Sequence, residues 1–301
     1  MNRSGGEAFE RHRAAIRARL AHSDRLRAGP GSVSWTINRE AVVVASWGRA
    51  ILLQLAHPSV AAGVHAHSSF RGSLRASFMR MQSTIGAILA LTFGDTEEMI
   101  AAAAGINAIH DRVRGAIPGR PGQTYSAHDP ELHRWVHATL LESVMLAYEQ
   151  LVGPLTPRER DQYCAEAAIM EPLLGMPAGW LPADAASLDA YMREMVAGGR
   201  LEVTGASRAL ARAVLFPPRW QTMWPAFRPL QLLTIGSLPP AIRSAYGFEW
   251  RPKDARALAR WIALLRTTRR LLPASIREWP ASRRRVENFA PALLHPINEP
   301  D

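Results

Sequence analysis

Apolar residues recur along most of this chain with the three- and four-residue spacing of amphipathic helices. The spacing predicts helices at residues 7–28, 37–56, 73–93, 96–116, 129–153, 156–171, 187–198, 204–214, 222–235 and 254–270. The alternation of apolar and polar positions that is typical of strands is scarce, and residues 201–204 form the single short stretch of this kind. The pattern therefore predicts an all-α fold, a single globular domain of many helices.

Start and stop signals mark several of these helices. Phe93-Gly94-Asp95-Thr96 reads as a stop followed by a cap, and Thr156 with Glu159 forms a capping box. Residues 118–130, between two predicted helices, are rich in proline and glycine. Loops of this length are usually functional or disordered, and Tyr125 and His128 within it favour an ordered loop.

The division into domains is simple, because the sequence shows no break in composition and no internal repeat. Residues 1–30 are charged and amphipathic, which predicts an N-terminal helical extension, either loose or docked late. Residues 31–301 then form the single domain. No run of 18 apolar residues occurs, and the most apolar helix, within 41–56, carries Arg49 and Gln54. We expect a soluble protein without a transmembrane segment, in the cytoplasm.

The strong positive charge changes this picture little. The formal net charge is +10, yet Lys253 is the single lysine among 36 basic residues. The arginines are scattered and form no recognised binding module, so codon usage explains them better than a nucleic-acid surface does. Cys164 is the one cysteine, which excludes an internal disulfide and a multi-cysteine metal site.

Histidines are concentrated between residues 57 and 137, where seven of the ten occur. His133 and His137 are four residues apart on one predicted helix, the spacing of two zinc ligands, but the sequence places no third ligand beside them. We expect His133 to face solvent beside Arg134. The sequence contains no glycine-rich phosphate loop and no nucleophile elbow.

The segment AAAAGINAIHDRVRG, residues 101–115, has the most informative pattern. Small residues let a flat ligand approach a helix, histidine is the commonest metal ligand, and arginine binds carboxylates. His110, one predicted helical turn before Arg114, is thus compatible with haem. A histidine at a helix–helix contact and a surface arginine explain the segment equally well. Arg80 and Thr84 share another helix face, where Arg80 could pair with a protein or a ligand carboxylate.

Several motifs in a fixed order resemble the catalytic domain shared by the oxygenase MpaB and the latex-clearing proteins, or rubber oxygenases. The similar run comprises REAVVVASWGRAILLQLAHPSVAAGVHAHSSF, RMQST, FGD, INAIHDRVRG, YSAHDPELHRWVHATLLES, LLGMP and SLPPAIRSAYG, within residues 35–250. The resemblance implies an all-α fold that encloses a haem b pocket. It implies that His110, in the HxxxR pattern, ligates the iron and that Arg114 lies near the haem. Arg80 and Thr84 match the RxxxT element on the other side.

Two differences from the rubber oxygenases limit which of their properties we expect in this chain. Rubber oxygenases have a lysine just before the threonine, where this chain has Ser83, and their catalytic glutamate has no counterpart in the stretch GVHAHSSF. Rubber cleavage itself is therefore not expected. As a distal polar group we expect His67, with His65 second and Thr84 nearby.

Together these features predict a haem-b-dependent oxygenase. Dioxygen or peroxide would be activated at iron held by His110 to oxidise a small apolar substrate, with isoprenoids the class that studied family members cleave. Two alternatives remain: a non-catalytic protein that binds or senses haem, and a haem-free helical scaffold. The sequence does not specify the oligomeric state.

Overall fold

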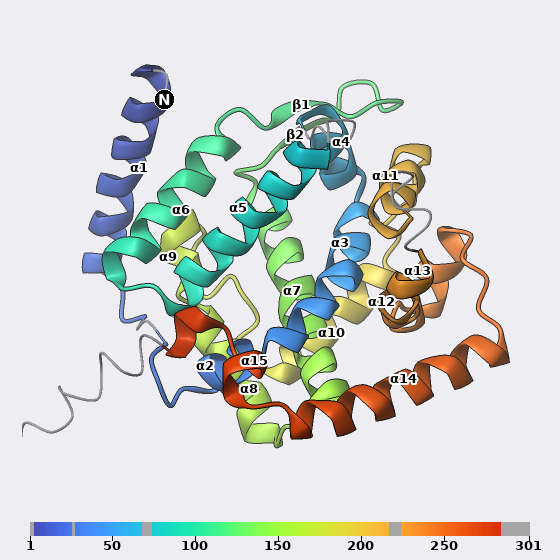
Figure 1. Cartoon of the computed structure of the whole chain (residues 1–301). Coiled ribbons are helices and arrows are strands. Elements are labelled where there is room, and N and C mark those ends of the chain that lie inside the picture. Colours follow the sequence, from blue (N-terminus) through green and yellow to red (C-terminus); the bar gives the residue numbers. More distant parts are fainter. Residues whose placement is uncertain (1–2, 26–27, 68–73, 217–223, 284–301) are drawn as a thin grey trace, which may run out of the picture.

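Helices account for 71 % of the chain, which confirms the predicted all-α class. The structure is a computed structural model and describes residues 3–25, 28–67, 74–216 and 224–283 (Figure 1). In the N-terminal half the helices are α1 (Arg3–Ala21), α2 (Val33–Asn38), the 3₁₀ helix η1 (Ala41–Ser46), α3 (Trp47–Leu55), α4 (Pro58–His67), α5 (Leu74–Phe93) and α6 (Thr96–His110). The others are α7 (Pro130–Leu151), α8 (Pro157–Ala167), α9 (Met170–Leu174), α10 (Ala185–Ala197), α11 (Gly205–Leu215), α12 (Trp224–Gly236), α13 (Pro240–Ala245), α14 (Pro252–Leu271) and α15 (Ala274–Arg277).

The largest core surrounds α7, which runs through the middle of the molecule (Figure 1). Trp135 of α7 is fully buried and packs in one cluster with Leu52 and Leu53 of α3, and α10, α11 and α13 close the same cluster. Burying large apolar side chains contributes about 1.5–3 kcal/mol each. This core therefore holds α3 and α7 in fixed positions, and α10, α11 and α13 pack around them.

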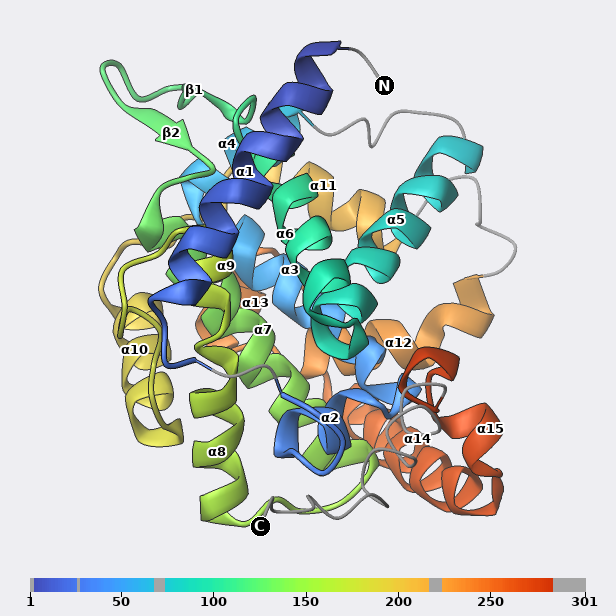
Figure 2. The ribbon, with the colours of Figure 1, turned by 90° about the vertical axis from the view of Figure 1, so that its left-hand side faces the viewer.

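A second core joins the N-terminal helix to α6. Ile16 of α1 is fully buried and packs with Met99, Ile100 and Ala103 of α6, and α1 lies alongside α6 and α9 (Figure 2). The N-terminal helix is therefore docked on the rest of the molecule. The boundary near residue 30 stays a prediction.

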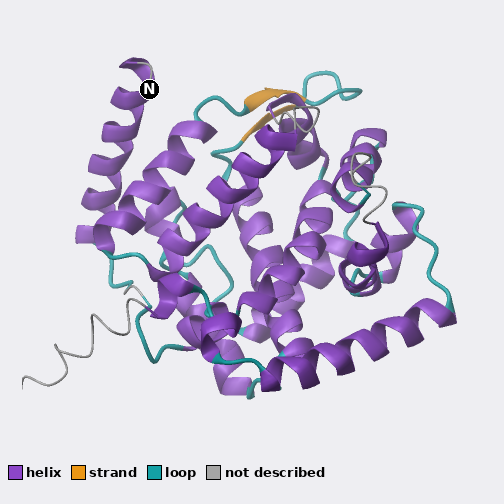
Figure 3. Cartoon of the chain, viewed as in Figure 1, coloured by secondary structure: helices purple, strands orange, loops and turns teal. Residues whose placement is uncertain are grey.

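Two short strands lie where the sequence predicted a helix end and a loop. β1 (Arg114–Ala116) and β2 (Thr124–Ser126) pair antiparallel and form a hairpin at one end of the molecule (Figure 3). Gly119 and Gly122 adopt positive φ in the connection, which glycine tolerates best. The prediction that helix 96–116 reaches Arg114 was wrong, because α6 ends at His110. Residues 201–204, whose short alternation left a strand open, form no regular element.

The predicted helix 37–56 is divided into α2, η1 and α3. The division falls at Glu40, whose backbone forms an isolated bridge with Glu278 and whose carboxylate accepts a hydrogen bond from Arg269 Nε at 2.9 Å. Contacts with the C-terminal part of the chain thus outweigh local helix propensity here. Helix α4, over the stretch GVHAH, was not predicted.

In the described part of the chain, no helix is both long and apolar enough to span a membrane.

Candidate functional site

Helix α6 positions His110. Asp95 and Glu98 form a capping box at its start, with hydrogen bonds of 2.8 Å in both directions. Near its end, the buried Asn107 donates a hydrogen bond of 3.0 Å to the carbonyl of Leu173 in α9. The helix is held at both ends, so His110, its last residue, has a defined place.

His110 lies in a group of histidines from three segments. Its Nδ1 is 3.4 Å from Nε2 of His133, near the start of α7. The ring of His128, just after β2, is 5.9 Å from the His110 ring between centroids. His133 is only 5 % exposed, so the prediction that it faces solvent was wrong. Other elements pack against α7 on several sides. Polar positions in its sequence pattern therefore do not all face water.

Burial keeps these imidazoles neutral. Desolvation, followed by repulsion from His133 and His128, lowers the pKa of His110 to about 4. Desolvation also lowers the pKa of His133 and brings that of His137, one turn further along α7, to about 4. A neutral imidazole is the form that ligates metals, so near pH 7 these side chains are ready to bind one.

The neighbours of His133 determine which nitrogen of His110 carries its proton. A hydrogen bond with the backbone of Ala127 raises the pKa of His133, so the ring donates to a carbonyl there. Because Nε2 of His133 faces His110, the donor to Ala127 is Nδ1, and Nε2 is left as an acceptor. Nδ1 of His110 is then the donor in this pair, which leaves Nε2 of His110 unprotonated and able to ligate a metal.

Helices α5 and α6 carry small or apolar residues with open space around them. Ile109, next to His110 in the sequence, is 55 % exposed. A Cβ added to Gly105 of α6 or to Gly86 of α5 would meet no atom within 4 Å. The two helices pack side by side. A neutral imidazole at the end of α6 and open space over these two glycines are compatible with a haem held through His110.

A cavity of about 190 Å³ lies nearby, between η1, α5, α7 and α8. Its walls are mostly apolar, including Trp47, Leu91 and Leu140. Among its polar residues, Tyr163 donates to Asn38 and Glu166 accepts from the backbone of Ser34. His137 also lines it, and within the described part of the chain its ring makes no hydrogen bond. The cavity thus combines apolar walls with a few polar groups, His137 among them, as small-ligand sites commonly do.

The structure does not bring together every residue expected around the haem. Arg114 is exposed on β1, where its backbone pairs with Ser126. Thr84 and Ser83 are exposed on α5. The side chain of Arg80 lies outside the described part of the chain.

His65 and His67 occupy the end of α4. Both are exposed, and the His67 ring contacts Tyr125 of β2 edge-on, with centroids 6.2 Å apart. This contact places His67 at the hairpin that follows α6. A distal role for either histidine remains a prediction.

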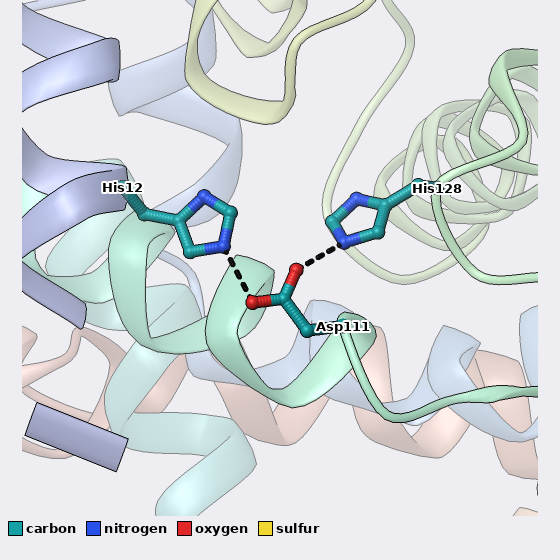
Figure 4. Close-up of side chains that lie close together, drawn as sticks. All are labelled: His12, Asp111 and His128. Atoms are coloured by element: carbon teal, nitrogen blue, oxygen red, sulfur yellow. Dashed lines mark hydrogen bonds and ion pairs between the residues drawn. The ribbon is translucent and has the colours of Figure 1, made fainter. Parts of the chain in front are cut away.

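A second group of side chains was missed by the sequence analysis. His12 of α1 and His128 each bring Nε2 to Asp111, at 2.9 and 2.8 Å (Figure 4). They approach different oxygens of the carboxylate from opposite sides. Asp111 and His128 stand in motifs that the sequence analysis noted, but no local signal brings residue 12 to them.

The fold and site define an all-α protein with neutral histidines, one of which, His137, lines an apolar cavity. Residues 35–267 match the family described as ER-bound oxygenase mpaB/B'/rubber oxygenase, catalytic domain. The chain belongs to this family, which confirms the resemblance and indicates an oxygenase, hence an oxidoreductase.

Two mycobacterial proteins are similar over most of their length. They are the uncharacterized protein Mb2261 of Mycobacterium bovis and the uncharacterized protein Rv2237 of Mycobacterium tuberculosis. Each is 27 % identical over 230 residues, which cover 74 % of this chain and 87 % of the relative. No solved structure matches the chain.

Proposed function

We propose that the protein is a haem-b-dependent oxygenase that uses dioxygen, or peroxide, to oxidise a small apolar substrate. The observation that carries the proposal is the His110 site: a partly buried, neutral imidazole whose Nε2 is left free by the hydrogen bond at Nδ1. The open space over Gly86 of α5 and Gly105 of α6 supports a planar apolar cofactor. Membership of an oxygenase family supports the reaction class.

His110 would hold the iron, and His133 would hold His110. When bound, haem supplies the dioxygen chemistry, and the protein controls ligation, access and substrate position. The hydrogen bond at Nδ1 makes an imidazole a stronger ligand and fixes its orientation. Arg114, Arg80 and Thr84 are proposed to contact the haem on its edges and opposite face. Ser83 offers no amine, so His67 or His65 would be the nearby polar groups.

The cavity beside α7 is proposed as the substrate site. Its apolar walls would exclude water and favour a hydrocarbon-like molecule, with isoprenoids the leading class. His137 stays neutral at its wall and could donate to or accept from one polar atom of the substrate. We place the activity in the cytoplasm, where a free buried thiol such as Cys164 is ordinary.

The test is haem retention by the full chain. Wild type, His110→Ala and, as a control, His22→Ala are expressed with haem supplied, passed through gel filtration, and compared by absorption spectrum. His22 is exposed, and its ring bonds to the carbonyl of Ala18 in its own helical segment. We expect wild type and the control to keep one haem per chain and His110→Ala to lose it while its circular dichroism is unchanged. A full haem complement with an unaltered spectrum in His110→Ala would refute the assignment.

The spin state of the ferric haem then distinguishes an oxygenase from a protein that only binds or senses haem. A high-spin ferric wild type that takes up cyanide, and that binds dioxygen after reduction with dithionite and its removal, supports an open position on the iron and an oxygenase. A low-spin wild type that becomes high-spin in His67→Ala or His65→Ala reveals a second histidine ligand and favours the haem-binding alternative, because a firmly held second ligand blocks dioxygen.

A further inference from the structure

We infer that His12, Asp111 and His128 form a binding site for a divalent first-row cation of the zinc class. The site is separate from the iron position proposed at His110 and does not rest on the proposed function. It would connect the N-terminal helix to the end of α6 and to the segment after β2.

The geometry supplies three ligand atoms. One atom from each of the three side chains lies within 4.8 Å of the other two: two imidazole nitrogens and one carboxylate oxygen. Figure 4 shows both rings turned with Nε2 toward the carboxylate, from opposite sides. Two histidines and one carboxylate form a common three-ligand set for zinc and neighbouring metals, with further positions left for water.

The surroundings agree with an accessible site. The Asp111 side chain is 30 % exposed and that of His128 is 36 % exposed, while His12 is 17 % exposed. Water can therefore reach the carboxylate and complete the coordination. The three ligands come from separate segments, with His12 lying 99 residues before Asp111 in the chain, so a cation binds them together only in the folded chain.

One nearby charge sharpens the inference. Arg11 approaches the same carboxylate, with Nη2 3.4 Å from Oδ2 of Asp111. It competes with a cation for Asp111, and its own side chain is largely exposed, so it can move away. Removing this positive charge is expected to tighten cation binding. If the cluster were only a hydrogen-bonded link between segments, removing Arg11 would create no affinity for a metal.

The experiment is a titration of the full chain, purified with chelator, with Zn²⁺ by calorimetry and with Co²⁺ by absorption. We expect one ion per chain in wild type and in the control His22→Gln. In His12→Gln and Asp111→Asn we expect affinity to fall by more than roughly 100-fold, since even the loss of a residue that only hydrogen-bonds to a metal ligand costs about 10–100-fold. Arg11→Gln is expected to bind more tightly than wild type.

Two further measurements distinguish loss of the metal site from a folding defect and from an effect on haem binding. Added Zn²⁺ should raise the Tm of wild type but not of His12→Gln, because binding stabilises only the state with a complete site. His110→Ala should keep its Zn²⁺ affinity, so failure of the haem proposal would leave this site intact. The absence of saturable one-to-one binding, equal affinity in His12→Gln and wild type, or loss of binding in His110→Ala would each overturn the inference.

Discussion

Polar side chains removed from solvent have different surroundings at the α3–α7 interface and at the end of α6 where His110 lies. At the first, Arg49 is 4 % exposed and well paired: it donates to Glu142 at 2.7 Å, to Ser143 at 2.7 Å and to the carbonyl of Ser237 at 2.8 Å. At the second, His110 and His133 contact each other and His137 lies one turn further along α7, and among the described residues none of the three has an ion-pair partner. The first arrangement stabilises the fold, and the second keeps neutral ligand atoms available.

Removing the charge at the α3–α7 interface should have the largest effect on stability. Arg49→Ala leaves Glu142 beside a space that the guanidinium filled, and breaking a buried pair in this way costs about 3–5 kcal/mol. Urea unfolding followed by circular dichroism measures the loss. The exposed pair Arg200–Glu194 provides the control, since Arg200→Ala should change stability by no more than about 1 kcal/mol. Equal effects would contradict the contrast between buried and exposed pairs.

The free energy of unfolding should fall in acid because of His137 on α7. The pKa of His137 is near 4 in the folded protein and near 6.5 in the unfolded chain. Below pH 6.5 the unfolded chain therefore binds a proton that the folded protein does not, so the free energy of unfolding falls as the pH drops from 6.5 toward 4. A shift of this size corresponds to roughly 3 kcal/mol.

The variant His137→Gln removes this titration and keeps a polar side chain of similar length. Its unfolding free energy should vary less between pH 6.5 and 4 than that of wild type, whereas the exposed His22→Gln should follow wild type. Identical slopes in His137→Gln and wild type would show that His137 titrates normally in the folded protein.

These contrasts also indicate what the sequence could reveal. The capping box of Asp95 and Glu98 and the proline start of α7 at Pro130 are local signals, so the starts of these two helices were predicted. Helix 37–56 was predicted whole, because its division at Glu40 depends on Arg269 and Glu278, more than 200 residues away. The hairpin strands have three residues each, too few for an alternating pattern to be recognised.

The candidate site could likewise be predicted from the sequence only where the signal is local. The pattern of residues 101–115 was enough to single out His110. The burial of His133 and its contact with His110 depend on how α7 docks against α6, and the approach of His12 to Asp111 depends on how α1 docks. Arg114 was placed on α6 by periodicity, but the chain turns after Asp111 and pairs Arg114 with Ser126 instead.

The contact between His133 and His110 can be tested without any assay of activity. His133→Phe keeps a ring in place but removes the acceptor, whereas His133→Gln restores one. Losing a hydrogen-bond partner of a metal ligand typically lowers affinity by about 10–100-fold, so haem should dissociate faster from His133→Phe, with partial recovery in His133→Gln. Nitrogen-15 NMR of the haem-free protein should show His110 protonated at Nδ1 in wild type. The same signal in His133→Phe would refute the proposed role.

The smallest effect is expected from Arg114. A desolvated arginine on a haem carboxylate would contribute several kcal/mol, but Arg114 is exposed on β1, where charged contacts are worth about 0–1 kcal/mol. Arg114→Ala should therefore raise the haem dissociation rate by no more than roughly fivefold, and this small effect should vanish in high salt because screening removes it. Stopped-flow transfer of haem to an acceptor globin at low and high salt measures both. A large, salt-insensitive increase would mean that bound haem draws Arg114 out of solvent, and that the end of α6 where His110 lies closes around the cofactor.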